Sequence, residues 1–268
     1  MSDAPFEVGL LSDLGGGWPG NEDACGQCQL DDNEVLVAVA DGVGGNGGGD
    51  VASRLAIETT IRLYRAGPAG RDPGKFLRHA VRQANVAIHD DALATPALAR
   101  MATTLTAVIV RGDLLWAVHV GDTRLYLVRG ETIRPLTRDH NVASERVRLH
   151  LQGAESARQD PERSLLTRSL GASFVPSVDR LSAQLEPGDR LVLCTDGIHT
   201  LIEDQEILGY CRGQSARAAC RSVVAAAKRR NPRDNLTIAV VVVNDVTRSA
   251  PERGAWRSGL SRLLNILD

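Results

Sequence analysis

The sequence is poor in aromatic residues, which make up 3% of its 268 positions, and it has no excess of basic residues, since its formal net charge is −2. Proteins that bind nucleic acids usually combine a basic surface with aromatic rings that stack on bases. We therefore expect no nucleic-acid partner. A hydrophobic content of 43% is instead typical of a globular chain that is long enough to bury a sizeable core.

Long apolar runs are also absent. No segment approaches the roughly 20 apolar residues that a transmembrane helix needs. The first residues lack the basic stretch and apolar core of a secretory signal. The sequence thus predicts a cytoplasmic protein with no transmembrane segment, and we expect it to act as a monomer.

Cysteine and histidine are scarce and scattered. The five cysteines are odd in number and fit reduced thiols better than a disulfide framework. Cys25 and Cys28 form a C-x-x-C pair, but no second ligand pair accompanies them, which favours two thiols in or beside a strand over a zinc or redox site. His119 alternates into an apolar strand, so we expect a hydrogen-bonded core residue rather than a ligand.

Apolar segments between turn signals predict strands, and apolar residues at helical spacing predict helices. The link at 111–113 is too short for a parallel crossover and requires an antiparallel hairpin. Ser215 is a capping residue that begins the last helix, and Pro232 cannot continue it. The expected strands are 35–40, 105–110, 114–120, 125–128, 191–194 and 236–243, and the expected helices are 50–64, 73–93 and 215–229.

This order of elements favours an α+β fold with largely antiparallel sheets and helices outside them. We expect one domain over residues 1–246. Its pattern loosens at about 139–171, where a short charged helix over 142–151 and a polar stretch indicate a flap-like insertion, either a lid or surface decoration. Residues 247–268 form an amphipathic tail, which we expect to pack on its own domain, the alternatives being a partner or a membrane surface.

Acidic residues recur where the chain leaves an apolar strand or is about to enter one. One such residue is usually a turn former, because its side chain bonds a nearby backbone amide. Several carboxylates brought together without Lys or Arg would repel one another, and a hard divalent cation such as Mn²⁺ or Mg²⁺ is the usual remedy. The residues in question are Glu22, Asp23, Asp41, Asp122, Asp196 and Asp234.

Read together, these segments resemble the motifs of the type 2C, or PPM, family of metal-dependent protein serine/threonine phosphatases, in the style of its bacterial members. Any one of the motifs is weak evidence. Their shared order and spacing, over about residues 8 to 244, is much stronger. The matching segments are Asn21-Glu22-Asp23-Ala24, Asp41-Gly42-Val43-Gly44-Gly45, Thr103-Thr104-Leu105, Gly121-Asp122, 136–140, Thr195-Asp196-Gly197 and Arg233-Asp234-Asn235.

The resemblance implies a four-layer α-β-β-α sandwich with two Mn²⁺ or Mg²⁺ ions per active site and a weaker third. A hydroxide bridging the two metals would attack phosphoserine or phosphothreonine directly. The catalytic carboxylates would be Asp41, Asp196 and Asp234. By motif position, Asp41 would bridge the two metals and the Gly42 carbonyl would contact one of them. Asp196 and Asp234 would hold the other metal. Glu22 and Asp23 would act through metal-bound water, and Asp122 would join Asp196 at the third site.

The sequence departs from the family at the position where most relatives carry an arginine that grips the substrate phosphate, which here is Trp18. Trp18, Asn46 and Arg168 are the candidate substrate-binding residues. Arg163 or Arg168 could supply the missing cation. The departure leaves open a weakly active or inactive member that binds phosphoproteins as a regulator. A two-metal phosphodiesterase fits the carboxylates but not the motif order.

An active enzyme of this type would take part in signal transduction. We expect its partners to be phosphorylated proteins, the substrates of a cognate serine/threonine kinase.

Overall fold

The structure is a computed structural model that describes residues 4–17, 19–44, 48–67, 71–158 and 160–246. Trp18, Asn46 and the tail at 247–268 lie outside the described residues. The elements, in chain order, are β1 (Phe6–Asp13), β2 (Asp23–Asp31), β3 (Glu34–Val43), α1 (Gly49–Ala66), α2 (Pro73–Ala94), η1 (Pro96–Leu98), β4 (Ala102–Thr103), β5 (Leu105–Arg111), β6 (Leu114–Val120), β7 (Arg124–Arg129), β8 (Thr132–Pro135), α3 (Val142–Arg148), α4 (Ala154–Arg158), β9 (Asp179–Gln184), β10 (Arg190–Cys194), α5 (Asp196–His199), α6 (Asp204–Cys211), α7 (Ala216–Lys228) and β11 (Leu236–Val243).

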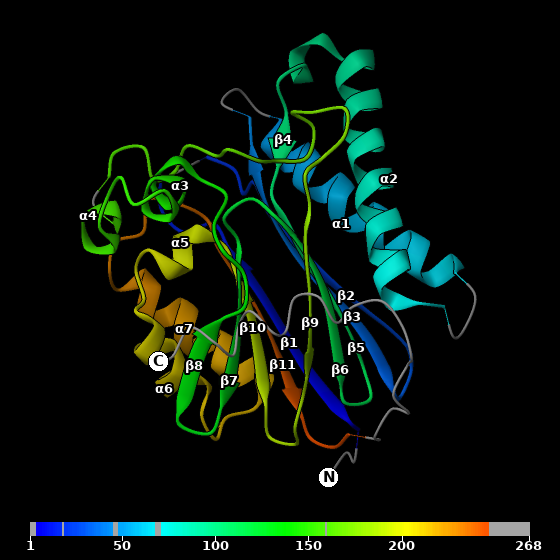
Figure 1. Ribbon diagram of the computed structural model, residues 1–268, viewed down its shortest axis with the longest axis vertical. Helices are drawn as coiled ribbons and strands as arrows, with labels where there is room; N and C mark the ends of the chain where they lie inside the picture. The colour runs from blue at the N-terminus through cyan, green and yellow to red at the C-terminus, as the bar shows by residue number, and fades with distance from the viewer. Residues whose placement is uncertain (1–3, 18, 45–47, 68–70, 159, 247–268) are drawn as a thin grey trace.

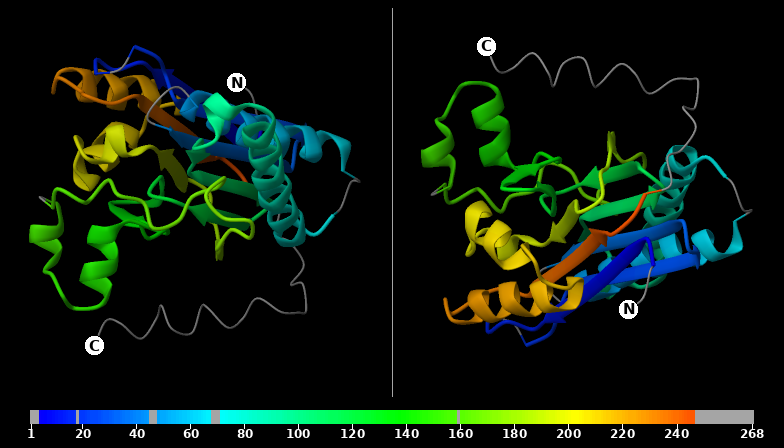
Figure 2. Two further views of the ribbon diagram at one scale, coloured as in Figure 1. Left: turned by 90° about the horizontal axis from the view of Figure 1, so that it is seen from above. Right: turned by 90° about the horizontal axis from the view of Figure 1, so that it is seen from below.

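Two antiparallel sheets pack face to face between two layers of helices (Figure 1). One sheet has the order β1-β11-β10-β7-β8, and the other has the order β2-β3-β5-β6-β9, with β4 paired to β3. Helices α1 and α2 pack on the second sheet, while α6 and α7 pack on the first, and the views along the other axis show the same layering (Figure 2). The expected four-layer α-β-β-α sandwich is confirmed.

Strand β3 shows why the central strands are apolar without interruption. Leu36, Ala38 and Ala40 face the core beneath α1 and α2. The alternate residues Val35, Val37 and Val39 face the core between the two sheets. A strand buried on both faces needs apolar side chains at every position, because successive side chains point to opposite faces. Because side chains alternate along the strand, Asp41, the residue after Ala40, points to the same face as Val39, between the two sheets.

The strands and long helices expected from the sequence are present with small shifts at their ends. The link at 111–113 does join an antiparallel pair, in which Arg111 lies opposite Leu114, and Gly112 takes the positive φ of 55° that the tight turn requires. Ser215 caps α7 by accepting a hydrogen bond from the Ala218 amide.

The segment expected to be an insertion folds as α3 and α4 beyond one end of the sheets (Figure 1). Its two ends are joined at the base by backbone hydrogen bonds, in which Val142 donates to Leu165 and Thr167 donates to His140. We call residues 139–171 the flap. The flap lies next to helix α5 (Figure 1).

Five cysteines are free thiols. Cys25 lies on β2, and burial together with the charge of Asp23 raises its pKa to about 11, which leaves the thiol protonated at neutral pH. The expectation of reduced cysteines is confirmed. Among the described residues, no helix is long and apolar enough to cross a membrane.

Candidate active site

The β2–β3 pairing places two carboxylates side by side at the end of the second sheet. Asp23, the first residue of β2, lies directly opposite Asp41 near the end of β3. Asp41 shares the face of Val39, which lies in the core between the sheets. The Asp41 backbone is held by its neighbours, since its amide donates to Thr104 Oγ1 at 2.9 Å and its carbonyl accepts from Thr103 Oγ1 at 2.8 Å.

The first sheet supplies Asp196 and Asp234 to the same end. Asp196 begins α5 immediately after β10, and Asp234 immediately precedes the segment that enters β11. These two strands are hydrogen-bonded neighbours. Gly197 allows the close approach, because a Cβ at this position would lie 2.0 Å from the Asn235 carbonyl oxygen. The contact brings the start of α5 against the start of β11.

Two hydrogen bonds tie the sheets together at this end. Thr195 Oγ1 donates to Asp23 Oδ2 at 2.9 Å, and the Glu22 amide donates to Asn235 Oδ1 at 2.8 Å. The Glu22 carbonyl in turn accepts from the Gly42 amide at 3.0 Å. Carboxylates from both sheets are therefore held in one place by short polar contacts, although their positions in the chain are far apart.

Asp122 approaches from the turn between β6 and β7. Its carbonyl contacts His199 Nε2 at 2.9 Å, which connects this turn to α5. The adjacent flap base is braced by a two-pronged ion pair, in which Arg124 Nε and Nη2 donate to the Asp139 carboxylate at 2.9 and 2.7 Å. Asp122 itself is buried, with 5% of its surface exposed.

The two histidines of this region act as buried braces. His119 contacts Thr106 Oγ1 through Nδ1 at 2.9 Å and the Arg138 carbonyl through Nε2 at 2.9 Å. His140 Nδ1 accepts from the Gly121 amide at 3.1 Å. The expectation that His119 is a hydrogen-bonded core residue is confirmed.

The carboxylates raise one another's pKa. For Asp41, burial is the largest cause, followed by the negative charges of Asp23 and Asp196. Burial also raises the pKa of Asp23 to about 7, against hydrogen bonds from Thr237 and Thr195 that lower it. The pKa of Asp196 rises to about 6, through burial first and then the charge of Asp234.

The pKa values of the remaining acidic residues are also raised. The pKa of Asp122 is raised by burial and by Asp196, that of Asp234 by partial burial, and that of Glu22 by burial and the charges of Asp50 and Asp234.

Within the described residues, these carboxylates have no ion-pair partner. In the ion pairs among the described residues, Asp23, Asp41, Asp122, Asp196 and Asp234 do not take part. Among the described residues, no group of three or more Asp, Glu, His or Cys side chains lies close enough together to hold a metal ion. A set of oxygen ligands whose charges repel one another, with Asp41 and Asp196 in hydrogen-bond contact, has the chemistry that suits a hard divalent cation.

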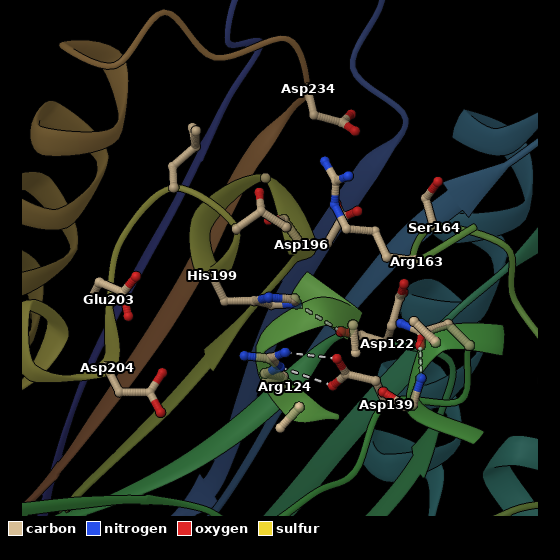
Figure 3. Close-up of a pocket in the computed structure, with 18 of the residues that line it drawn as sticks. Asp122, Arg124, Asp139, Arg163, Ser164, Asp196, His199, Glu203, Asp204 and Asp234 are labelled. Atoms are coloured by element: carbon tan, nitrogen blue, oxygen red, sulfur yellow. Dashed lines mark hydrogen bonds and ion pairs between the residues drawn. The ribbon is translucent and has the colours of Figure 1, made fainter. Parts of the chain in front are cut away.

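A cleft of about 860 Å³ opens beside this cluster. Its walls come from the flap, from α5 and the start of α6, and from the segment before β11 (Figure 3). Asp122, Asp196 and Asp234 line it. The substrate-binding candidate Arg168 does not line it, because its guanidinium pairs with Asp179 Oδ1 at 2.8 Å and contacts His140 Nε2 at 3.2 Å.

Comparison with known proteins agrees with this fold. The family described as Protein phosphatase 2C matches residues 19–214. The serine/threonine protein phosphatase PstP of Mycobacterium tuberculosis is 35% identical over 78% of this chain, which spans only 40% of that protein's length. The serine/threonine phosphatase stp of Listeria monocytogenes is 32% identical over 85% of this chain and 92% of its own length.

A solved structure of the PstP catalytic domain in complex with two manganese ions is also similar. It superposes with a TM-score of 0.79 at 31% identity, covering 90% of this chain and 99% of that one. The fold is an α-β-β-α sandwich, and carboxylates from both sheets lie at one end of it. The chain belongs to the protein phosphatase 2C family.

Sequence reasoning located the carboxylates but missed the residues that hold them. Thr195 and Asn235 bridge the two sheets, and nothing in the local pattern indicates this role. The available signal is that both stand in segments that resemble the family, directly next to Asp196 and Asp234. His199 was missed because α5 is too short to produce a helical pattern.

Proposed function

We propose that this protein is a Mn²⁺- or Mg²⁺-dependent protein serine/threonine phosphatase that hydrolyses phosphoserine and phosphothreonine in proteins. The proposal is supported most by one observation: carboxylates from both sheets gather around Asp41, and none of the described residues forms an ion pair with it. The similarity to serine/threonine phosphatases over most of the chain supports it further.

The side chains that would hold two cations are Asp41, Asp196 and Asp234, with the Gly42 carbonyl. Glu22 and Asp23 would act through water, and Asp122 would join Asp196 at a weaker third site. Divalent cations at such a position lower the pKa of water and neutralise charge on phosphoryl oxygens, which is the main electrostatic task in phosphoryl transfer.

The rest of the site would position the carboxylates and the substrate. The hydrogen bonds of Thr195 and Asn235 join the two sheets at the site. The cleft between the flap and α5 gives a phosphorylated side chain access to Asp196 and Asp234 (Figure 3). The proposed substrates are phosphorylated proteins, the products of a serine/threonine kinase, and the flap at 139–171 is the proposed substrate-contacting insertion of a phosphatase domain over 1–246.

The test is hydrolysis of a phosphothreonine peptide with Mn²⁺, with Mg²⁺ and with a chelator. We expect turnover with either metal, none with chelator, and background turnover in Asp196→Asn. Manganese binding, followed by calorimetry, should weaken in the same variant. Asp32→Asn, in the exposed turn between β2 and β3, is the matched control and should behave as the wild type.

The outcomes separate this function from its alternatives. A wild type that binds the phosphopeptide without hydrolysing it, and that gains turnover in Trp18→Arg, would indicate the regulatory role instead. Hydrolysis of a phosphodiester but not of the phosphopeptide would indicate a phosphodiesterase.

A further inference from the structure

The arginines that line the cleft fall into two groups. Three are already engaged: Arg124 with Asp139, Arg148 with Glu145 at 2.7 Å, and Arg230 with Glu206 at 3.0 Å. The guanidinium groups of the other three make no hydrogen bond or ion pair with any residue that the structure describes. These three are Arg138, Arg163 and Arg233. An exposed, unengaged guanidinium in a cleft is available to a ligand.

Arg163 is presented to the cleft by a well-defined turn of the flap. Asp160, which is 6% exposed, accepts from the Glu162 amide at 2.8 Å and from Arg146 Nη1 at 2.9 Å. The Asp160 carbonyl accepts from the Arg163 amide at 3.1 Å. Figure 3 shows the Arg163 side chain extending from the flap toward Asp196 and Asp234. The flap thus directs a positive charge at the carboxylates across the cleft.

Arg233 comes from the opposite wall. It directly precedes Asp234 and lines the same cleft. The glycine loop before position 18 is packed against its backbone, since a Cβ on Gly17 would lie 1.9 Å from the Arg233 carbonyl oxygen and one on Gly15 would lie 1.9 Å from that of Asp234. The backbone at Gly17, the last described residue before position 18, therefore lies against Arg233.

The third unengaged arginine fits this role less well. Arg138 directly precedes Asp139, which is paired with Arg124 at the base of the flap, and its carbonyl contacts His119 Nε2 at 2.9 Å, so its backbone belongs to the β6–β7 side of the cleft and not to the segment that carries Asp234.

A phosphomonoester is a dianion at neutral pH, and a guanidinium group binds such oxygens through two parallel hydrogen bonds. An indole ring carries no positive charge, so Trp18 cannot do this. We propose that Arg163 and Arg233 together bind the phosphate group of the substrate and supply the positive charge that position 18 lacks. The inference rests on the proposed function and assigns its phosphate-binding residues.

The kinetic test uses the manganese-loaded full chain and a phosphothreonine peptide. Arg163→Ala and Arg233→Ala should each raise KM by on the order of tenfold, with a smaller change in kcat, because each removes a charged hydrogen bond to the phosphate. Arg163→Lys should fall between Arg163→Ala and the wild type, since it keeps the charge but loses the forked geometry. Arg217→Ala, exposed on α7, is the control and should not change KM.

A second measurement does not depend on turnover. Inorganic phosphate binding, followed by calorimetry on the same proteins, should weaken in both alanine variants and most in the double variant. Adding Trp18→Arg to the double variant should restore phosphate binding. Circular dichroism melts check that every variant is folded.

Unchanged KM and phosphate affinity in the double variant, with normal metal-dependent turnover in the wild type, would overturn the arginine assignment and leave the proposed function standing. A wild type without turnover would overturn the function, and the phosphate affinities would still decide the assignment. If only one of the two single variants showed a raised KM and weaker phosphate binding, the assignment of both arginines to the phosphate would be overturned.

Discussion

His119 is a buried titratable residue near the site, and its protonation should affect stability. Its burial, together with the neighbouring His140 ring at 4.7 Å, lowers its pKa to about 4 from an ordinary value of 6.5. The charges of Asp139 and Asp179 act in the opposite direction but are weaker. His119 is therefore neutral in the folded protein at every pH above about 4.

This shift predicts how stability depends on pH. Below pH 6.5, the unfolded chain takes up a proton on His119 and the folded protein does not. The contribution of His119 to the free energy of unfolding is therefore fully present above pH 6.5 and is lost as the pH falls toward 4. When the pH is lowered from about 7.5 to about 5, we expect the titration of His119 to reduce the free energy of unfolding by about 2 kcal/mol.

Urea denaturation of the metal-free protein at the two pH values measures this cost, with His119→Gln as the comparison. Gln retains a donor for the Arg138 carbonyl but cannot titrate. The acidic cluster and His199 titrate in both proteins, so the difference between the two pH dependences isolates His119. Equal pH dependences in the two proteins would contradict the assignment.

At this scale, the sequence predicts the acidic residues better than their surroundings. Asp122 and Asp196 each follow an apolar strand, and Asp41 follows the apolar residues 35–40 near the end of β3, which is a pattern visible in the chain itself. The contact from Thr195 to Asp23 spans 172 positions. No local pattern contains such a contact, because it depends on how the two sheets stack.

At the scale of elements, the start of α5 packs closely against the segment that enters β11, and these two segments carry Asp196 and Asp234. We expect Gly197→Ala to separate them, because the new methyl would lie 2.0 Å from the Asn235 carbonyl oxygen and 3.4 Å from the Asp234 Cβ. Overpacking of this kind costs roughly 1–3 kcal/mol of stability. Both the melting temperature and the manganese affinity should fall.

Gly209→Ala is the matched control. Gly209 is also helical, in α6, and a Cβ there would meet nothing within 4 Å. Alanine is the better helix former, so this variant should gain about 0.5–1 kcal/mol. Calorimetric melts with and without Mn²⁺ compare the two. If Gly197→Ala bound manganese as tightly as the wild type, the junction would not set the spacing of the two carboxylates.

Elements differ in how well the sequence predicts them. Strands β3, β5 and β11 are buried on both faces and read as continuous apolar runs. Strand β2 alternates Asp, Gly and Gln with its two cysteines and is mostly half-buried or exposed, so its pattern is weak. The short helices α5 and α6 lie below the length at which helical periodicity becomes distinct.

At the scale of the whole molecule, the site draws its carboxylates from both sheets, whose described strands run from β1 to β11. Strand β11 pairs with β1 along its full length, from Phe6 opposite Val243 to Asp13 opposite Leu236. Beyond β11, the Asn244 amide donates to the Pro5 carbonyl at 2.8 Å, which closes this corner of the first sheet. The residues that would bind metal and phosphate all precede Val243.

We therefore expect a chain ending at residue 246 to fold and to keep metal-dependent hydrolysis of the phosphothreonine peptide, with the KM of the full chain. The apolar spacing at 247–268 predicts packing on the same domain, and removal of that contact should lower the melting temperature without changing turnover. Thermal melts and kinetics of the full and shortened chains give both quantities. An unchanged melting temperature would contradict the packing and favour a partner or membrane surface for the tail, whereas loss of turnover in a folded shortened chain would place part of the site beyond β11.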